Sequence, residues 1–155
     1  MTNRDGVRSN AGRPRYDSEV TSIELPPERS AAAAARRFTR EVAAPWALDP
    51  HVQADVELLV SELVTNAVLH ARSSARLTIE RIGDRVRVTV ADDSKLRPRL
   101  RDYGADAVTG RGIFLVDQIS EQWGVDVADD GDEGKRVWFE IATTYAANPA
   151  KEVRS

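Results

Sequence analysis

The sequence has 155 residues, of which 41% are hydrophobic, and its formal net charge at pH 7 is −3. This length suits one globular domain of about 100–150 residues with short tails, and the slightly acidic balance provides no positive field for nucleic acid or an anionic membrane. The absence of cysteine excludes disulfides and thiolate metal sites and is compatible with a cytoplasmic protein.

Residues 1–19 are rich in Arg, Asn, Ser and Gly and have little to bury, so we predict a disordered tail there. They contain no apolar segment like that of a secretory signal. No stretch of the chain approaches the roughly 18–20 apolar residues of a membrane span. We therefore expect a cytoplasmic protein, with a folded domain over residues 20–143 and a second tail over residues 144–155.

The folded part is predicted to begin with a strand over residues 20–25, where apolar and polar residues alternate before two prolines. Residues 28–44 are dense in strong helix formers and end before Pro45, which predicts a helix. Asp49 and Pro50 then have the residue types of an N-cap and a first helical position, so a second helix should begin there.

This second helix contains the sequence DVELLVSELVTNAVLHA over residues 55–71. Its apolar residues fall on one broad arc, as in a helix packed on a core. Glu62, Asn66 and His70 recur at every fourth position along the border of that arc. Burying an unpartnered carboxylate or amide costs about 1–3 kcal/mol, so these groups need partners. Either they hydrogen-bond within the protein, or Asn66 provides an oxygen to a cation and Glu62 accepts a proton.

Residues 75–82 and 85–91 alternate strictly between apolar and polar, and Gly83-Asp84 between them predicts a two-residue hairpin turn. Asp92 follows the second strand and precedes a segment without periodicity that extends to Gly110. Loops of this length in compact domains tend to be functional lids or binding loops. A carboxylate at this point can accept from an exocyclic amine such as that of adenine, although capping a loop is an equally ordinary role for Asp.

A helix is predicted from residue 111 to about 122, led by Gly110 and Gly112. The unpaired N–H groups at such a start suit a phosphate, but Gly-x-Gly before a helix is also a common turn. Strands over residues 123–128 and 136–143 follow, separated by an acidic glycine turn. The order of elements predicts an α+β fold, a two-layer sandwich with helices on one face of a mixed, mostly antiparallel sheet.

Taken together, these motifs resemble the GHKL ATPase superfamily, which includes gyrase-type topoisomerases, heat-shock chaperones and histidine kinases. The resemblance covers roughly residues 20–143 and rests on E-L-V-T-N-A in a helix, a strand ending in Asp, a lid-length loop and T-G-R-G-I-F-L-V. The strand and helix before the Glu-Asn helix make the chain similar to bacterial anti-sigma-factor serine kinases. The implied structure is a Bergerat-type ATP-binding fold.

The resemblance implies an ATP site that also takes Mg²⁺. By this resemblance Glu62 is the general base, Asn66 is the Mg²⁺ ligand, and Asp92 binds the adenine amine. The phosphate end of the nucleotide is then expected at the start of the glycine-led helix, at Gly110, Arg111, Gly112 and Ile113.

The same resemblance implies a serine kinase that phosphorylates an anti-sigma-factor antagonist, sequesters a sigma factor and forms a homodimer. The alternative is a nucleotide-gated protein-binding module without kinase turnover. Two departures bear on this choice: the family's Asp-x-Gly-x-Gly box reads DDSKL over residues 92–96, and its closing Gly-Thr is Gly134-Lys135. We expect less backbone freedom near the nucleotide, and no hydroxyl at residue 135 for the adenine region.

Overall fold

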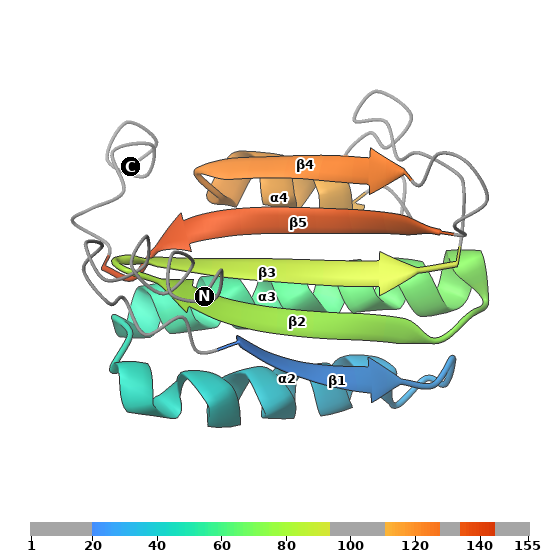
Figure 1. Ribbon diagram of the computed structural model, residues 1–155, viewed down its shortest axis with the longest axis horizontal. Coiled ribbons are helices and arrows are strands. Elements are labelled where there is room, and N and C mark those ends of the chain that lie inside the picture. The colour runs from blue at the N-terminus through green and yellow to red at the C-terminus, as the bar shows by residue number, and fades with distance from the viewer. Residues whose placement is uncertain (1–19, 94–110, 128–133, 145–155) are drawn as a thin grey trace, which may run out of the picture.

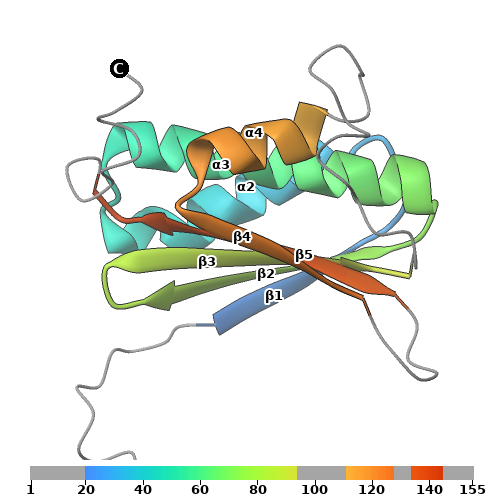
Figure 2. The same cartoon turned by 90° about the horizontal axis from the view of Figure 1, so that it is seen from above.

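The computed structural model describes residues 20–93, 111–127 and 134–144. These residues form two layers, a five-stranded sheet and a layer of helices that covers one of its faces (Figures 1 and 2). The strand order is β1-β2-β3-β5-β4, and each neighbouring pair is antiparallel. The predicted α+β sandwich is therefore confirmed, with a sheet that is antiparallel throughout its described strands rather than mixed. The predicted lid loop and most of both tails lie outside the described residues.

The first two elements are the edge strand β1 (Val20–Leu25) and the helix α2 (Ala31–Ala43), which lies behind β1 in Figure 1. α2 begins three residues later than predicted, because residues 26–30 form turns closed by the N–H groups of Glu28 and Ala31. Every fourth residue of α2 is buried, so one face packs on the core: Ala31, Ala35, Thr39 and Ala43. A short 3₁₀ turn, η1 (Ala44–Trp46), follows.

The central helix α3 (Pro50–Asn66) begins as predicted, with the Asp49 side chain accepting a hydrogen bond from the His51 N–H at 3.0 Å. The predicted apolar arc is buried, with each residue at most 3% exposed: Val52, Val56, Leu59, Val60, Leu63 and Ala67. After Asn66 the helix widens into a π-helical turn, η2 (Ala67–Ala71). Glu62 and Asn66 are therefore one α-helical turn apart, as predicted, but the helical geometry changes between Asn66 and residue 70.

The predicted hairpin is confirmed as β2 (Ala75–Ile82) and β3 (Arg85–Asp92), with Gly83 in the left-handed region at φ 61°. Apolar side chains of both strands face the helices, and polar ones face away: Ala75, Leu77, Ile79, Val86, Val88 and Val90 are the buried set. β3 is one residue longer than predicted and includes Asp92. That residue falls on the buried, helix-facing side of the strand.

The remaining elements are α4 (Arg111–Ile119), β4 (Gln122–Val127) and β5 (Lys135–Ala142). α4 lies beside α3 in the helical layer (Figure 2). It ends three residues earlier than predicted, where the Ser120 hydroxyl donates to the carbonyl of Val116 at 2.6 Å. Each of the two strands begins one residue earlier than predicted. In the described part of the chain no helix is long and apolar enough to cross a membrane.

Candidate functional site

The structure brings the α3 motif and the glycine-led helix into contact. Glu62 and Asn66 lie one turn apart on α3 and are half-buried. Gly112, near the start of α4, packs directly on both. A Cβ atom at residue 112 would lie 2.6 Å from Nδ2 of Asn66 and 3.3 Å from Cβ of Glu62. A side chain at residue 112 would therefore displace the Asn66 amide, and two predicted parts of the site are adjacent.

The Asn66 side chain has no hydrogen-bond partner among the residues that the structure describes. Its Nδ2 faces Gly112, and because the two polar atoms of a carboxamide point apart, Oδ1 is directed away from that residue. An amide oxygen in a half-buried position suits a hard cation. Within the described ranges no cluster of three or more His, Asp or Glu side chains can hold a metal by itself. The arrangement thus fits Mg²⁺ that arrives with phosphate groups, which is how Mg²⁺ commonly binds.

The start of α4 provides backbone N–H groups next to this pair. α4 has nine residues, Gly112 is buried, and Ile113 is only 1% exposed with its side chain in the core. Any contact of Ile113 with a phosphate would therefore come from its main chain. Gly110 and the side chain of Arg111 lie outside the described parts, so their predicted roles remain predictions.

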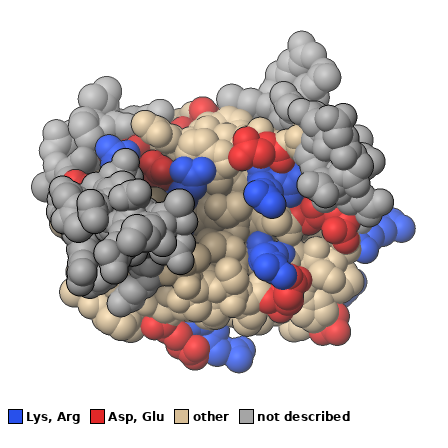
Figure 3. Space-filling view, viewed as in Figure 1, with Lys and Arg blue, Asp and Glu red and all other residues tan. Residues whose placement is uncertain are grey.

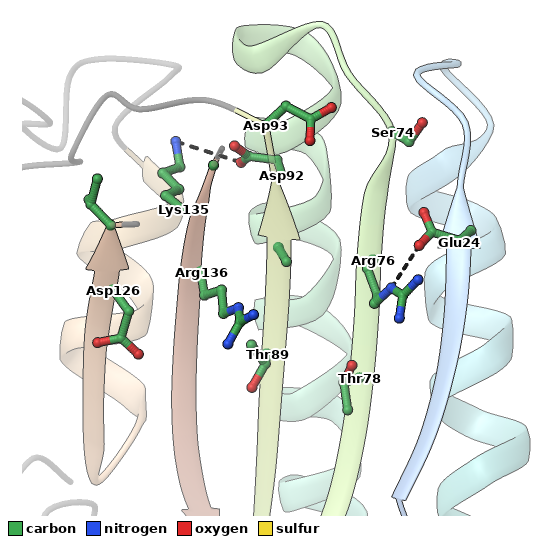
Figure 4. Close-up of a pocket in the computed structure, with 13 residues that line it drawn as sticks. Glu24, Ser74, Arg76, Thr78, Thr89, Asp92, Asp93, Asp126, Lys135 and Arg136 are labelled. Atoms are coloured by element: carbon green, nitrogen blue, oxygen red, sulfur yellow. Dashed lines mark hydrogen bonds and ion pairs between the residues drawn. The ribbon is translucent and has the colours of Figure 1, made fainter. Parts of the chain in front are cut away.

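Asp92 is the last residue of β3 and is 7% exposed. It pairs in register with Lys135, the first residue of β5, and Nζ of Lys135 lies 3.7 Å from Oδ2 of Asp92 (Figure 4). The two side chains are only 3% and 10% exposed, so this is a buried ion pair. The sequence indicated a missing hydroxyl at residue 135 but not this pairing. Asp92 and Lys135 lie next to the ends of the two predicted strands, but the sequence does not show which residues of those strands pair with each other.

Gly134 closes this end of the sheet. Its φ is +111°, and a Cβ atom there would overlap the carbonyl oxygen of Asp92 and approach Cα of Asp93 to 3.3 Å. The N–H of Asp93 in turn donates to the hydroxyl of Ser73, before β2, at 3.3 Å. The end of β3, the start of β5 and the approach to β2 are thus held together around the Asp92–Lys135 pair.

A separate hollow of about 940 Å³ lies on the sheet face opposite the helices. Figure 3 shows this face, where charged side chains surround a tan central hollow. It is lined by outward-facing residues of β2, β3 and β5, among them Ala91. Figure 4 shows four others: Arg76, Thr78, Thr89 and Arg136. The hollow reaches Asp92 and Lys135 only at the strand ends. It is distinct from the Glu62–Asn66 contact, and the sequence analysis did not predict it, because alternating polar residues are typical of any solvent-facing strand.

Comparison with known proteins identifies the family. The histidine kinase-like ATPase domain matches residues 25–141. The chain belongs to this family. No curated protein matches the sequence of this histidine kinase-like ATPase domain.

Two solved structures share the fold of the domain. The crystal structure of the RsbU and RsbW domains of Rv1364c from Mycobacterium tuberculosis matches with a TM-score of 0.62 and 21% identity, over 80% of this chain and 32% of that chain. The SiaB-SiaC complex from Pseudomonas aeruginosa matches with a TM-score of 0.58 and 15% identity, over 88% of this chain and 95% of that chain. This chain thus spans about a third of the first of these proteins.

Membership in the histidine kinase-like ATPase family implies ATP binding, ordinarily with Mg²⁺. The geometry around α3 and α4 fits that ligand in three respects: an amide without a described partner, a glycine packed against it at a helix start, and a buried carboxylate at the end of β3. All three lie in or face the helical layer of the domain.

Proposed function

We propose that this histidine kinase-like ATPase domain is a cytoplasmic protein serine kinase. It would use ATP to phosphorylate an anti-sigma-factor antagonist, and it would sequester a sigma factor until the unphosphorylated antagonist competes for it. The observation that supports this most directly is the packing of Gly112 on Glu62 and Asn66. It places a carboxylate, an amide and a helix start within one small region, as phosphoryl transfer requires.

Each residue of this region has a specific role in the proposal. Glu62 would accept the proton of the attacking serine hydroxyl as general base. Asn66 would hold Mg²⁺, which supplies positive charge that offsets the charge on the transferring phosphate. The backbone N–H groups at the start of α4, around Gly112, would hold the phosphate end.

The partners are inferred from the chain's resemblance to anti-sigma-factor serine kinases. One of the similar structures is a complex of SiaB with SiaC, and the other contains RsbU and RsbW domains within one chain. One of these two structures is thus a complex of two different proteins. We extend this to the present chain as binding of an antagonist and of a sigma factor, by a homodimer.

A second function, a nucleotide-gated binding module without kinase turnover, is favoured by one observation. The residue that stands in place of the family's Thr, Lys135, is engaged in a buried ion pair with Asp92. Together with the sequence DDSKL over residues 92–96, this gives the base end of the site a chemistry different from that of the family's kinases. Such a site can bind a nucleotide without positioning it for transfer.

Two measurements test the proposal. Calorimetric titration with ATP, with and without Mg²⁺, is expected to show binding that Mg²⁺ strengthens, and absence of any nucleotide binding would overturn both functions. Incubation with γ-labelled ATP and a candidate antagonist is expected to place label on a serine of the antagonist. If ATP binds but no label is transferred to any antagonist tried, the result would instead support the gated binding module. The Glu62→Gln variant, which lacks the proposed general base, is the negative control for transfer.

A further inference from the structure

We infer that Lys135 broadens the base specificity of the nucleotide site. The Asp92–Lys135 pair would let the site bind 6-oxopurines, such as guanine and hypoxanthine, as well as adenine. This inference rests on the proposed function, because it assumes that the purine of a bound nucleotide lies against Asp92. It goes beyond that function by assigning a role to the position at which the chain departs from its family.

The position of Lys135 is fixed by the sheet. Asp92 and Lys135 are register partners in β3 and β5, and Nζ lies 3.7 Å from Oδ2. Gly134, with φ +111° and no room for a Cβ atom against Asp92, determines where β5 begins. Because both side chains are at most 10% exposed, neither can turn freely into solvent. The ammonium is therefore a fixed neighbour of the carboxylate.

The pair provides an acceptor and a donor next to each other. At 3.7 Å the two side chains form an ion pair rather than a hydrogen bond. A carboxylate has about four lone-pair sites and an ammonium has three donors, so each side chain can hydrogen-bond to a base while the ion pair is kept. Adenine has a donor, its 6-amino group, next to an acceptor, N1. Asp92 would accept from the amino group while Lys135 donates to N1.

Guanine and hypoxanthine reverse this order, with an acceptor at O6 and a donor at N1. Because the two side chains are held in place, such a base would lie turned over relative to adenine, with Lys135 donating to O6 and Asp92 accepting from N1–H. If residue 135 had no donor, the Asp92 carboxylate would face O6 without a hydrogen bond between them. Such a site would bind adenine much more tightly than guanine, because a buried polar group without a hydrogen bond costs free energy. Lys135 is thus the residue that removes the discrimination.

The first test uses the unaltered chain. Affinities for the Mg²⁺ complexes of ATP, ITP, GTP and 1-deaza-ATP, which lacks the N1 acceptor, are measured by calorimetry. We expect ITP and GTP to bind within about tenfold of ATP, and 1-deaza-ATP to bind about tenfold or more weaker, as loss of a hydrogen bond to a charged donor predicts. This series does not depend on the folding of any variant.

The second test changes the donor. Lys135→Met removes the ammonium but keeps much of the side-chain volume, and is expected to increase the preference for ATP over GTP about tenfold or more and to make ATP and 1-deaza-ATP equivalent. Lys135→Arg retains a charged donor and should keep tolerance of GTP. Arg136→Met is the matched control, since it removes the neighbouring cation on the opposite face of β5. Thermal unfolding of each variant verifies the fold.

The outcomes separate this inference from the proposed function. If the chain binds ATP but rejects GTP and ITP by about a thousandfold or more, as sites built for one hydrogen-bond pattern do, Lys135 has no selecting role. Equal binding of ATP and 1-deaza-ATP by the unaltered chain, or an unchanged base preference in folded Lys135→Met, would overturn the inference in the same way. In each of these cases ATP binding stands. Failure to bind any of the four nucleotides would overturn the proposed function itself.

Discussion

Gly112 of α4 lies so close to Asn66 of α3 that a Cβ atom at residue 112 would be 2.6 Å from Nδ2 of Asn66. Real Cβ atoms do not approach neighbouring atoms this closely, so one of the two groups would have to move. The absence of a side chain at residue 112 therefore leaves room for the Asn66 amide at its present position. The glycine that the family resemblance assigns to phosphate binding thus also makes space for the proposed metal ligand.

Gly112→Ala is accordingly expected to weaken nucleotide binding by displacing the Asn66 side chain. Its effect on stability should be small, because the nearest atom is the end of a side chain that can rotate, and alanine is favoured over glycine in a helix by about 1 kcal/mol. Gly124→Ala is the control for overpacking, because a Cβ there would lie 2.7 Å from the Trp138 ring on the open face of the sheet. It should lower stability with little effect on affinity. Calorimetry and thermal unfolding of both variants provide the comparison. A Gly112→Ala protein with unchanged ATP affinity would show that Asn66 does not need this position.

Asn66→Ala should abolish the Mg²⁺-dependent part of nucleotide binding, because it removes the one protein oxygen assigned to the cation. Thr65→Ala is a suitable control on the same helix, since the Thr65 hydroxyl donates to the carbonyl of Ser61, one turn earlier, at 2.7 Å. Titrations of ATP with Mg²⁺ and with EDTA measure the difference in affinity for each protein. If the Mg²⁺ dependence of Asn66→Ala matches that of the unaltered chain, the cation is held elsewhere.

Glu62→Gln is expected to leave ATP binding nearly intact and to lower the rate of phosphoryl transfer about 10²–10⁴-fold, as loss of a general base does. Glu57→Gln serves as the control, because Glu57 lies on the same helix in an ion pair with Arg40 at 2.6 Å, remote from the proposed chemistry. Transfer of label to an antagonist is followed for both. Full activity in Glu62→Gln would dismiss it as the base.

Local patterns predicted much of this fold, for a physical reason. The alternation over β2 and β3 and the apolar arc of α3 report directly which side chains are buried, and the structure confirms them. The ends of helices were less predictable. Residues 28–30 have helix-forming composition but follow two prolines that leave them in turns, and the widening at η2 has no signal in the sequence pattern.

The candidate site also has parts that local patterns indicate and parts that depend on long-range packing. Glu62 and Asn66 were identified from one helix, because their spacing is a local property. Their contact with Gly112, and the ion pair of Asp92 with Lys135, depend on how α4 packs on α3 and on the register of β5 with β3. Such relationships join segments far apart in the chain, so composition and spacing do not reveal them.

Asp92→Ala tests the base end of the site. It removes the acceptor for the adenine amine and leaves the buried Lys135 ammonium without its carboxylate, since the two now lie 3.7 Å apart. Breaking a buried pair from one side typically costs about 3–5 kcal/mol, so a lower unfolding temperature is expected. The affinities for ATP and GTP should both fall, because Asp92 would accept from the 6-amino group of adenine and from N1–H of guanine.

The matched control for this change is Asp126→Ala, which removes an exposed carboxylate of β4 that borders the hollow on the open face. It should alter neither the unfolding temperature nor the affinities for ATP and GTP appreciably. Both quantities are measured for the two variants in the same buffer, at a temperature well below the transition of Asp92→Ala. A folded Asp92→Ala protein that binds ATP and GTP as tightly as the unaltered chain would place the purine away from Asp92, and the base site would have to be sought elsewhere in the domain.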